Sequence, residues 1–146
     1  EALGARDRAL VGTSGDDTLS FDGAALISVA GGNGTDTLSF TGGDLSLDLR
    51  DRALRVESIE IIDLRGSGDN TLLLDDAAVR RLPQTRAGLP AGLAKTLVVL
   101  ADATDRLHFE TSGYEAIGSN AGRDVYRKTG AFYGIEVSPG VALMAP

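Results

Sequence analysis

The chain has 146 residues, 42% of them hydrophobic and 24% charged, which predicts a single folded domain over 1–146 with a modest core. Its formal net charge of −7, without any basic stripe interleaved with aromatic residues, excludes nucleic acid as a partner. With no cysteine it has neither disulfides nor thiolate chemistry, and no apolar run is long enough to predict membrane insertion.

Short apolar runs and glycine-rich turns alternate along the first two thirds of the chain. Four turns have a predicted strand on each side: 9–11 and 18–21, 26–29 and 37–40, 59–64 and 71–74, 96–99 and 106–109. Alternating Leu and polar residues predict a further half-buried strand at 45–49. These strands predict an all-β fold.

The insertions between the turns predict less regular structure. Residues 44–58 hold the strand just named and an arginine-bearing turn. A two-turn helix is expected over 75–82, because Asp75 suits its start, Arg80 and Arg81 its last turn, and Pro83 its end. We predict an exposed loop at 83–95, an irregular stretch at 111–124, and a closing hairpin of 124–128 with 132–137.

A nine-residue motif repeats in the turns. Residues 31–39 read G-G-x-G-x-D-x-U-x, where U is a large aliphatic residue, and 12–20, 65–73 and 100–108 are imperfect copies. The glycines permit tight turns that direct carbonyl groups inward, and the aspartate adds a carboxylate. Two stacked loops of this kind would surround a cation with hard oxygen ligands, which suit Ca²⁺. The aspartate position holds Asp17, Asp36, Asn70 and Asp105.

Calcium is therefore the predicted cofactor. The first predicted level pairs Asp17 with Asp36, a second pairs Asp36 with Asn70, and a third uses later acidic residues. The alternative is that the glycine-aspartate turns only cap strands and bind no metal. The complete set of candidate ligands is Asp16, Asp17, Asn33, Asp36, Asp63, Asp69, Asn70, Asp102 and Asp105, with the loop residues Gly15, Gly32 and Gly34.

The same alignment predicts columns of like side chains on neighbouring coils. Inside the coil we expect Leu19, Leu38, Leu72 and Leu107 to stack, with Phe21, Phe40, Leu74 and Phe109 at alternate positions. On its surface we expect a ladder of Thr18, Thr37 and Thr71. All of these residues are given structural roles.

The aromatic residues near the C-terminus have two interpretations. Tyr114, Tyr126, Tyr133 and Arg127 combine aromatic rings with a basic group, as ligand-binding faces often do. They also suit a cap over the last coil, which repeat folds require, and the cap is the favoured interpretation.

No catalytic residue is predicted. The chain has no G-x-S-x-G elbow, no HExxH and no P-loop, and its one histidine, His108, is expected to point outward without a nucleophile. We therefore expect a protein that is not an enzyme.

The nonapeptides and the phrases ESIEIIDLRGSGDNTLLL and TLVVLADATDRLHF resemble the RTX (haemolysin-type) repeat modules of large bacterial adhesins and biofilm surface proteins. The resemblance covers roughly residues 9–110. It implies a type I-secreted, extracellular or cell-surface protein folded by Ca²⁺, of which this chain is a fragment beside neighbouring domains. The implied function is attachment or cohesion.

The expected architecture is a short, irregular parallel β-roll or solenoid with calcium-binding turns, one short helix and a capping hairpin, and a calcium-bound β-sandwich is the alternative. We expect a monomer. The alternative function is a peptide- or sugar-binding adhesin domain that uses bound calcium. A remote alternative is the calcium module of a polysaccharide lyase or epimerase, with Arg65 or Arg106 as the base.

Overall fold

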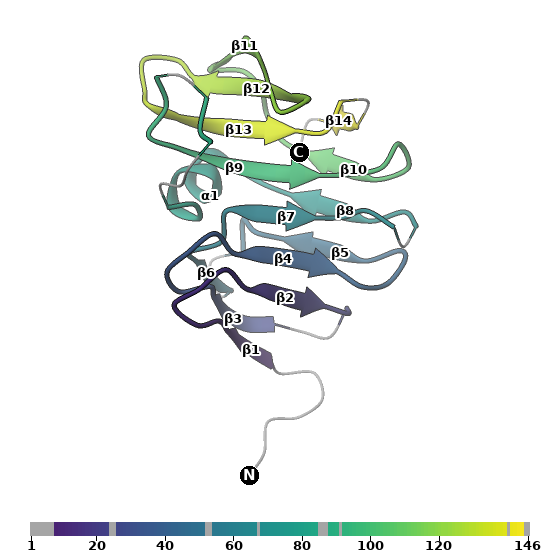
Figure 1. The fold of residues 1–146 in the computed structure, drawn as a ribbon. Helices are drawn as coiled ribbons and strands as arrows, with labels where there is room; N and C mark the ends of the chain where they lie inside the picture. Colours follow the sequence, from purple (N-terminus) through teal and green to yellow (C-terminus); the bar gives the residue numbers. More distant parts are fainter. Residues whose placement is uncertain are drawn as a thin grey trace.

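The computed structural model describes residues 8–23, 26–51, 54–66, 68–84, 88–90, 92–139 and 141–144. In this part of the chain, fourteen strands and one short helix are present (Figure 1). The strands form three sheets, so the expectation of a mostly β protein with one short helix is confirmed. The described helix has six residues, and no helix among the described residues could span a membrane.

The three sheets are built mainly from parallel pairs. Sheet A contains β1 (Arg8–Val11), β3 (Leu26–Ala30) and β6 (Arg55–Glu57). The parallel part of sheet B contains β2 (Thr18–Phe21), β4 (Thr37–Phe40), β7 (Ile61–Asp63), β9 (Lys95–Leu100) and β13 (Tyr133–Val137). Sheet C contains β5 (Ser46–Asp48), β8 (Thr71–Leu73), β10 (Arg106–His108) and β14 (Ala142–Met144).

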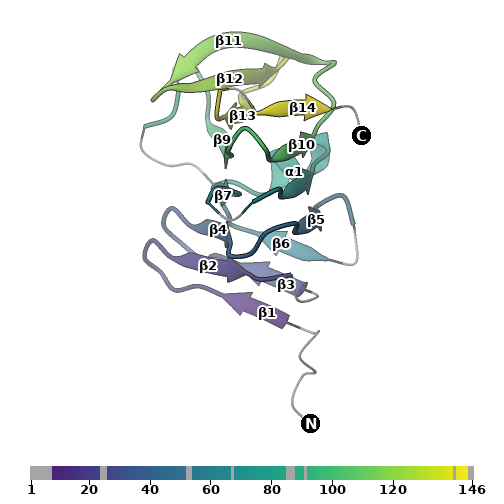
Figure 2. The same cartoon turned by 90° about the vertical axis from the view of Figure 1, so that its right-hand side faces the viewer.

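The chain visits these sheets in a fixed order, A then B then C, and we call each passage a circuit. The first circuit is β1–β2, the second β3–β4–β5 and the third β6–β7–β8. In the fourth, α1 (Asp76–Arg81) takes the place of a sheet A strand before β9 and β10. The fifth consists of β13 and β14. Figures 1 and 2 show the circuits stacked along one axis.

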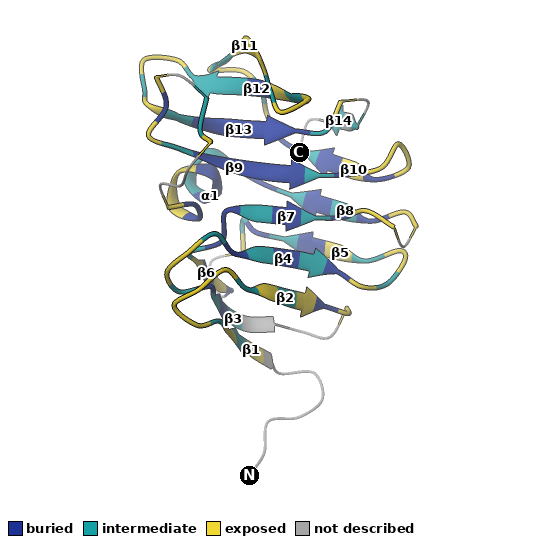
Figure 3. Ribbon diagram, viewed as in Figure 1, coloured by how far each residue is buried: buried dark blue, intermediate teal, exposed yellow. Residues whose placement is uncertain are grey.

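The register of the stack follows from the repeat. The identical Thr-Leu-Ser-Phe sequences of β2 and β4 pair residue on residue, and the rings of Phe21 and Phe40 meet edge to face at 5.0 Å. On sheet B, Leu38, Ile62 and Val99 form a fully buried column. On sheet C a second column is formed by Leu47, Leu72, Leu107 and Leu143. Figure 3 shows this buried interior.

The two columns correct one expectation. Leu72 and Leu107 do not stack on Leu38, because they belong to sheet C and Leu38 belongs to sheet B. For the same reason Thr71 pairs with Ser46 and Arg106, whereas Thr18 and Thr37 pair with each other. The side chains expected in a single column therefore form two columns, one on sheet B and one on sheet C.

The predicted helix and closing hairpin are confirmed. The Oδ1 atom of Asp75 accepts a hydrogen bond from the amide of Ala78 at 2.9 Å and caps α1. Strand β12 (Arg123–Lys128) runs antiparallel to β13.

Three other regions differ from expectation. The stretch predicted to be irregular at 111–124 contains β11 (Tyr114–Asn120), antiparallel to β12, with a bulge near Gly118. Residues 44–58 contain β6 as well as β5. In the loop predicted at 83–95, Leu93 is buried and Lys95 begins β9, while 85–87 and 91 lie outside the described residues.

The two ends of the stack differ. At one end, β12 pairs with β13 and β11 lies beyond it, so the hairpin occupies the position of a further sheet B strand (Figure 1). At the other end, β1 and β2 each have a strand neighbour on one side only. The C-terminal end thus finishes in antiparallel strands, and at each end the outermost strands, β11 and β14 or β1 and β2, have a strand neighbour on one side only among the described residues.

Candidate metal centre

Three carboxylates form a stack at the corner that joins sheet A to sheet B, which we call the A–B corner. The amide of Asp17 donates to Asp36 Oδ1 at 2.9 Å, and the amide of Asp36 donates to Glu60 Oε1 at 2.8 Å. The amide of Gln84 donates to Glu60 Oε2 at 2.9 Å. Each residue stands immediately before a sheet B strand, so the parallel pairing of these strands stacks the three side chains.

Asp36 is the incompletely bonded member of the stack. Asp36 and Glu60 are both fully buried, and Oδ2 of Asp36 has no hydrogen-bond partner. In the first circuit, by contrast, Oδ2 of Asp17 accepts from the amide of Thr13 at 2.6 Å and from its hydroxyl at 3.1 Å. Gly32 holds the place of Thr13 in the second circuit and has no hydroxyl to donate. The corner therefore leaves one buried carboxylate oxygen free.

Burial and neighbouring negative charge raise the pKa of two members of the stack, Asp36 and Glu60. Burial is the largest cause that raises the pKa of Asp36; the hydrogen bond from the Asp17 amide opposes it, and the charges of Asp17 and Asp16 raise the pKa further. Burial also raises the pKa of Glu60, against the hydrogen bonds from the amides of Asp36 and Gln84. In the described part of the chain, no lysine or arginine forms an ion pair with the stack. A proton or a cation from solution would relieve this unbalanced charge.

Glycines let the loops approach the carboxylates. A Cβ on Gly31 would lie 2.0 Å from the carbonyl oxygen of Ser58 and 2.7 Å from Asp36 Oδ2. A Cβ on Gly12 would likewise lie 2.3 Å from the carbonyl oxygen of Gly31 and 2.7 Å from Asp17 Oδ2. Each carboxylate therefore lies close to a backbone carbonyl oxygen, in an approach that only a residue without a side chain allows. Such oxygen donors fit a hard cation such as Ca²⁺.

The loop residues predicted as ligands lie around the same corner. Asp16 Oδ1 accepts from the amide of Thr35 at 2.7 Å and ties the first loop to the second. Gly32 and Gly34 adopt φ of 86° and 93°, and a Cβ on Gly34 would lie 2.7 Å from the carbonyl oxygen of Gly15. Asn33 is exposed in the same loop. Asp16, Asp17 and Asp36 and these loop residues therefore lie together at the A–B corner.

The predicted pairing of Asp36 with Asn70 is wrong, because Glu60 lies against Asp36 instead. The insertion between the second and third nonapeptides contains β5, β6 and β7, so the chain completes a full circuit, returns to the A–B corner at Glu60, and then passes one corner more. The third nonapeptide consequently joins sheet B to sheet C, and so does the fourth. Asn70 and Asp105 lie at this second turn, the B–C corner.

The B–C corner satisfies its own polar groups. The side-chain oxygen of buried Asn70 accepts from the amide of Leu45 at 2.9 Å, and its Nδ2 donates to the carbonyl of Leu64 at 3.0 Å. The two carboxylate oxygens of buried Asp105 accept from the amides of Asn70 at 2.9 Å and Asp102 at 2.7 Å. The side-chain amide of Asn70 thus supplies a hydrogen-bond donor at this corner. Among the described residues, no buried side-chain oxygen there lacks a partner.

The other acidic candidates lie near this second corner and mostly have partners of their own. Asp63 forms a two-pronged ion pair with Arg65, with N–O distances of 3.0 and 3.1 Å. Asp102 Oδ2 accepts from the amide of Gly66 at 2.8 Å, and Asp69 is exposed. The structure therefore does not bring these three residues to the Asp17–Asp36 pair.

The aromatic residues predicted as a cap or a ligand-binding face point toward the protein. The hydroxyls of Tyr114 and Tyr133 donate to Asp76 Oδ1 at 2.6 and 2.7 Å, and Tyr126 packs against the core. Arg127 forms an ion pair with Glu115 at 3.1 Å. These contacts attach the hairpin to α1, as the cap interpretation requires.

Sequence reasoning missed Glu60, the third member of the stack. It lies outside any nonapeptide and in a run of isoleucines. Its position before a strand was the available signal. Five strands are each preceded directly by an acidic or amide residue, and these residues are Asp17, Asp36, Glu60, Asn70 and Asp105.

A complete acidic cage is not present. Among the described residues, no group of three or more His, Cys, Asp or Glu side chains is arranged to hold a metal ion. The A–B corner instead offers the Asp17–Asp36 pair, and further ligands there would be backbone carbonyl oxygens or water.

No protein-family model matches the chain, and comparisons with curated proteins and with solved structures find no match either.

Proposed function

We propose that this chain is a calcium-stabilised module of an extracellular bacterial adhesin of the RTX kind, which serves attachment or cohesion and has no catalytic role. We further propose that its stacked circuits form a short, irregular parallel β-solenoid. Calcium binds at the A–B corner, where Asp17 and Asp36 are ligands together with carbonyl oxygens of the glycine loops. The proposed ion links the first circuit to the second.

One observation carries this proposal: the free Oδ2 of buried Asp36 beside the carboxylate of Asp17. A buried carboxylate without a counter-charge destabilises a fold, and a divalent cation would convert that cost into stabilisation. The glycines that border the carboxylates and the unbroken nonapeptide at 31–39 support the same ion.

The attachment role is supported by the shape of the molecule rather than by a reaction centre. The Thr and Ser side chains of β2 are exposed and those of β4 are half-buried, whereas β9 and β13 of sheet B are mostly buried and the core columns are aliphatic. A module braced by calcium would be folded at the millimolar calcium level at which extracellular sites are typically occupied.

The test is thermal unfolding with calcium or with EDTA, together with calorimetric titration of Ca²⁺. Calcium at tenfold its dissociation constant stabilises the folded state by about 1.4 kcal/mol per site, a rise in melting temperature of roughly 3–6 °C. Asp36→Asn should abolish this rise and leave the EDTA form at least as stable as the wild type, because it removes a buried charge.

Asp69→Asn is the matched control. Asp69 belongs to a nonapeptide but is exposed at the other corner, so this variant should keep the full response to calcium. Identical unfolding of the wild type in calcium and in EDTA would contradict the proposal. So would a response to magnesium equal to that to calcium, because a flexible loop of carbonyl groups does not suit the small, rigidly octahedral ion.

A further inference from the structure

Sheet A stops at β6 although the stack continues. The next circuit has α1 where a fourth sheet A strand would lie, and α1 packs against β9 and β13. Strand β6 consequently pairs with β3 on one edge only. Its other edge faces the region of α1 without a strand neighbour among the described residues.

The open edge of β6 carries a buried backbone donor and acceptor. The amide of Gly31 donates to the carbonyl of Glu57 at 3.1 Å, so Glu57 directs its backbone groups toward β3, and Arg55, two residues earlier, does the same. Backbone groups alternate in direction along a strand, so the N–H and C=O of Val56 face the open edge. Val56 is only 3% exposed. Buried backbone groups are normally paired, so this position suits a ligand with a complementary backbone.

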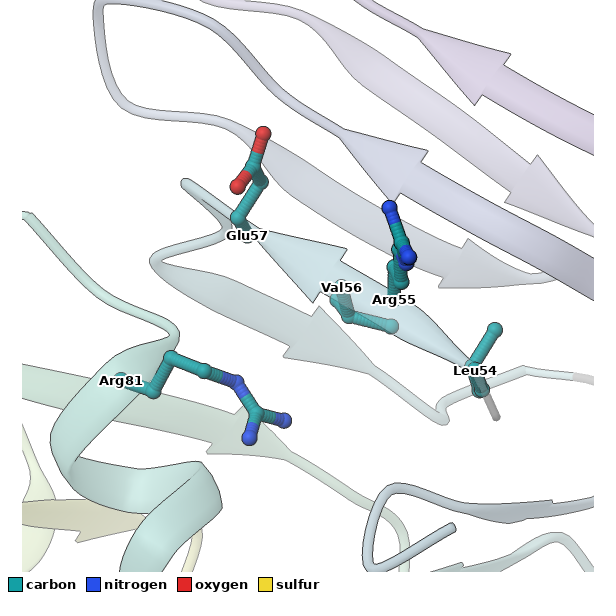
Figure 4. Close-up of a pocket in the computed structure, with 5 residues that line it drawn as sticks. All are labelled: Leu54, Arg55, Val56, Glu57 and Arg81. Carbon is teal, nitrogen blue, oxygen red and sulfur yellow. The ribbon is translucent and has the colours of Figure 1, made fainter. Parts of the chain in front are cut away.

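A cavity of about 250 Å³ adjoins this edge, lined by Leu54, Arg55, Val56, Glu57 and Arg81. Figure 4 shows the Arg81 side chain extending from α1 toward β6, with Val56 lying between Arg81 and the Arg55 side chain. Within the described residues, neither arginine forms an ion pair or a hydrogen bond. Two guanidinium groups without acidic partners are notable in a chain of net charge −7, and they favour an anionic group in the ligand.

We propose that an extended peptide segment with an acidic side chain binds at the open edge of β6 and completes sheet A as its fourth strand. The peptide backbone accepts from the N–H of Val56 and donates to its C=O, and the acidic side chain pairs with Arg81 or Arg55. Small apolar side chains of the peptide pack on Leu54 and Val56. This site is separate from the proposed calcium corner, and the inference does not depend on calcium.

A peptide is favoured over a free anion because the N–H and C=O of Val56, which have no strand partner on this edge among the described residues, are a donor and an acceptor side by side. An extended backbone supplies the complementary pair at the spacing of a strand, whereas a carboxylate or phosphate supplies acceptors only. The arginines then add preference for an acidic sequence.

The experiment titrates the isotopically labelled protein with the synthetic peptide acetyl-Thr-Val-Asp-Val-Thr-amide and follows the backbone amides by NMR. We expect the amide signals of Val56 and of its neighbours in β6 to shift in a saturable manner. Arg81→Gln should weaken binding roughly tenfold, because a hydrogen bond to a charged group contributes about that much. The matched control Arg80→Gln, one residue earlier on α1 and outside the cavity, should leave binding unchanged.

Two further probes separate the peptide backbone from its charge. A peptide with N-methyl groups on all five residues has no backbone N–H within the strand to donate to the Val56 carbonyl and should not bind, whereas replacing Asp by Asn should weaken binding without abolishing it. The proposal is overturned if the Val56 amide does not respond at millimolar peptide, or if the N-methylated peptide binds equally well. It is also overturned if acetate alone reproduces the shifts, because the site would then recognise an anion only.

Discussion

A single atom distinguishes the two corners of this molecule. At the A–B corner the residue before the strand is Asp36, whose buried Oδ2 has no partner; at the B–C corner it is Asn70, whose Nδ2 donates to a backbone carbonyl at 3.0 Å. Both residues are fully buried. The amide needs nothing further, whereas the carboxylate needs a proton or a cation, and this difference underlies the proposed calcium site.

The raised pKa values of Asp36 and Glu60 predict how stability varies with pH in EDTA. The folded state retains protons on these groups at pH values where the unfolded chain has lost them. Their stabilising contribution is therefore complete below the unfolded carboxylate pKa of about 4 and is lost as the pH rises through the folded values. In EDTA, the melting temperature of the wild type should fall relative to that of Asp36→Asn as the pH rises above this range.

Calcium should reverse that pH dependence, because calcium competes with protons for the same oxygens and binds better as the pH rises. Differential scanning calorimetry of both proteins, in EDTA and in calcium, measures the two slopes. Parallel pH curves for the wild type and Asp36→Asn in EDTA would show that this carboxylate is not protonated in the fold. Asp48 and Asp76 have lowered pKa values, which make stability increase with pH. Both residues are present in the wild type and in Asp36→Asn, so they contribute equally to the two pH curves.

At the scale of elements, local patterns predicted the strands that adjoin glycine turns, the alternating strand β5 and the hairpin strands β12 and β13, but did not predict β6, β11 or β14. Strands β2 and β4 have alternation and a turn motif before them, and α1 has its cap at Asp75. Strand β6 was missed because Arg-Val-Glu has one apolar residue, and its pairing with β3 comes from the stacking of circuits rather than from propensity. Strand β11 was missed because it contains Gly and Ser and depends on β12 for its hydrogen bonds.

The candidate site was predictable only where the repeat is tight. Asp17 and Asp36 are 19 residues apart, one circuit, so sequence spacing alone places them together. Because strand β6 was not predicted, Asn70 and Asp105 were assigned to the A–B corner, although they lie one corner further on, at the B–C corner. Each unrecognised strand carries the chain past another turn. Glu60 could not be identified by motif, because its side chain reaches the stack without a glycine loop.

The contact between α1 and the hairpin gives a prediction at this scale. Tyr114→Phe removes the hydrogen bond from the hydroxyl to Asp76, and we expect a loss of about 1–1.5 kcal/mol in unfolding free energy. Asp76 retains Tyr133, so the loss should stay at the low end for a bond to a charged group. Urea denaturation measures it. Tyr126→Phe, on β12, is the control, because the Tyr126 hydroxyl has no hydrogen-bond partner among the described residues, and it should unfold as the wild type does. An equal effect of both variants would mean that loss of any tyrosine hydroxyl here, rather than of the Asp76 contact, sets the cost.

At the scale of the whole molecule, the end of the stack at β2 and the interior of the stack impose different constraints on sequence. The amides of Thr37 and Thr41 donate to the carbonyls of Asp17 and Phe21 at 2.8 and 2.9 Å. The backbone groups of every second residue from Asp17 to Phe21 therefore face β4. Those of Thr18 and Ser20, which lie between them, face the unpaired edge. Proline is tolerated at such an edge and not inside a sheet.

Equivalent serines in the first two circuits test this difference. Ser20→Pro should cost less than about 1 kcal/mol, because the lost N–H has no strand partner. Ser39→Pro, at the paired position in β4, should cost about 3 kcal/mol or more, because it removes a bond between β2 and β4. Urea unfolding compares the two. Equal destabilisation would mean that the β2 edge is engaged by another part of the protein.

The asparagine at the B–C corner has a consequence for how the chain acquires its structure. In circuits three to five, the buried Asn70 and Asp105 side chains, the cap of α1 and the hydroxyl of Tyr114 have hydrogen-bond partners among the described residues. The first two circuits carry the unpaired oxygen and meet the third circuit through the pairs β3–β6, β4–β7 and β5–β8. We expect the chain to fold in one direction, from a metal-independent nucleus near the C-terminus toward the N-terminus, with calcium controlling only the final step.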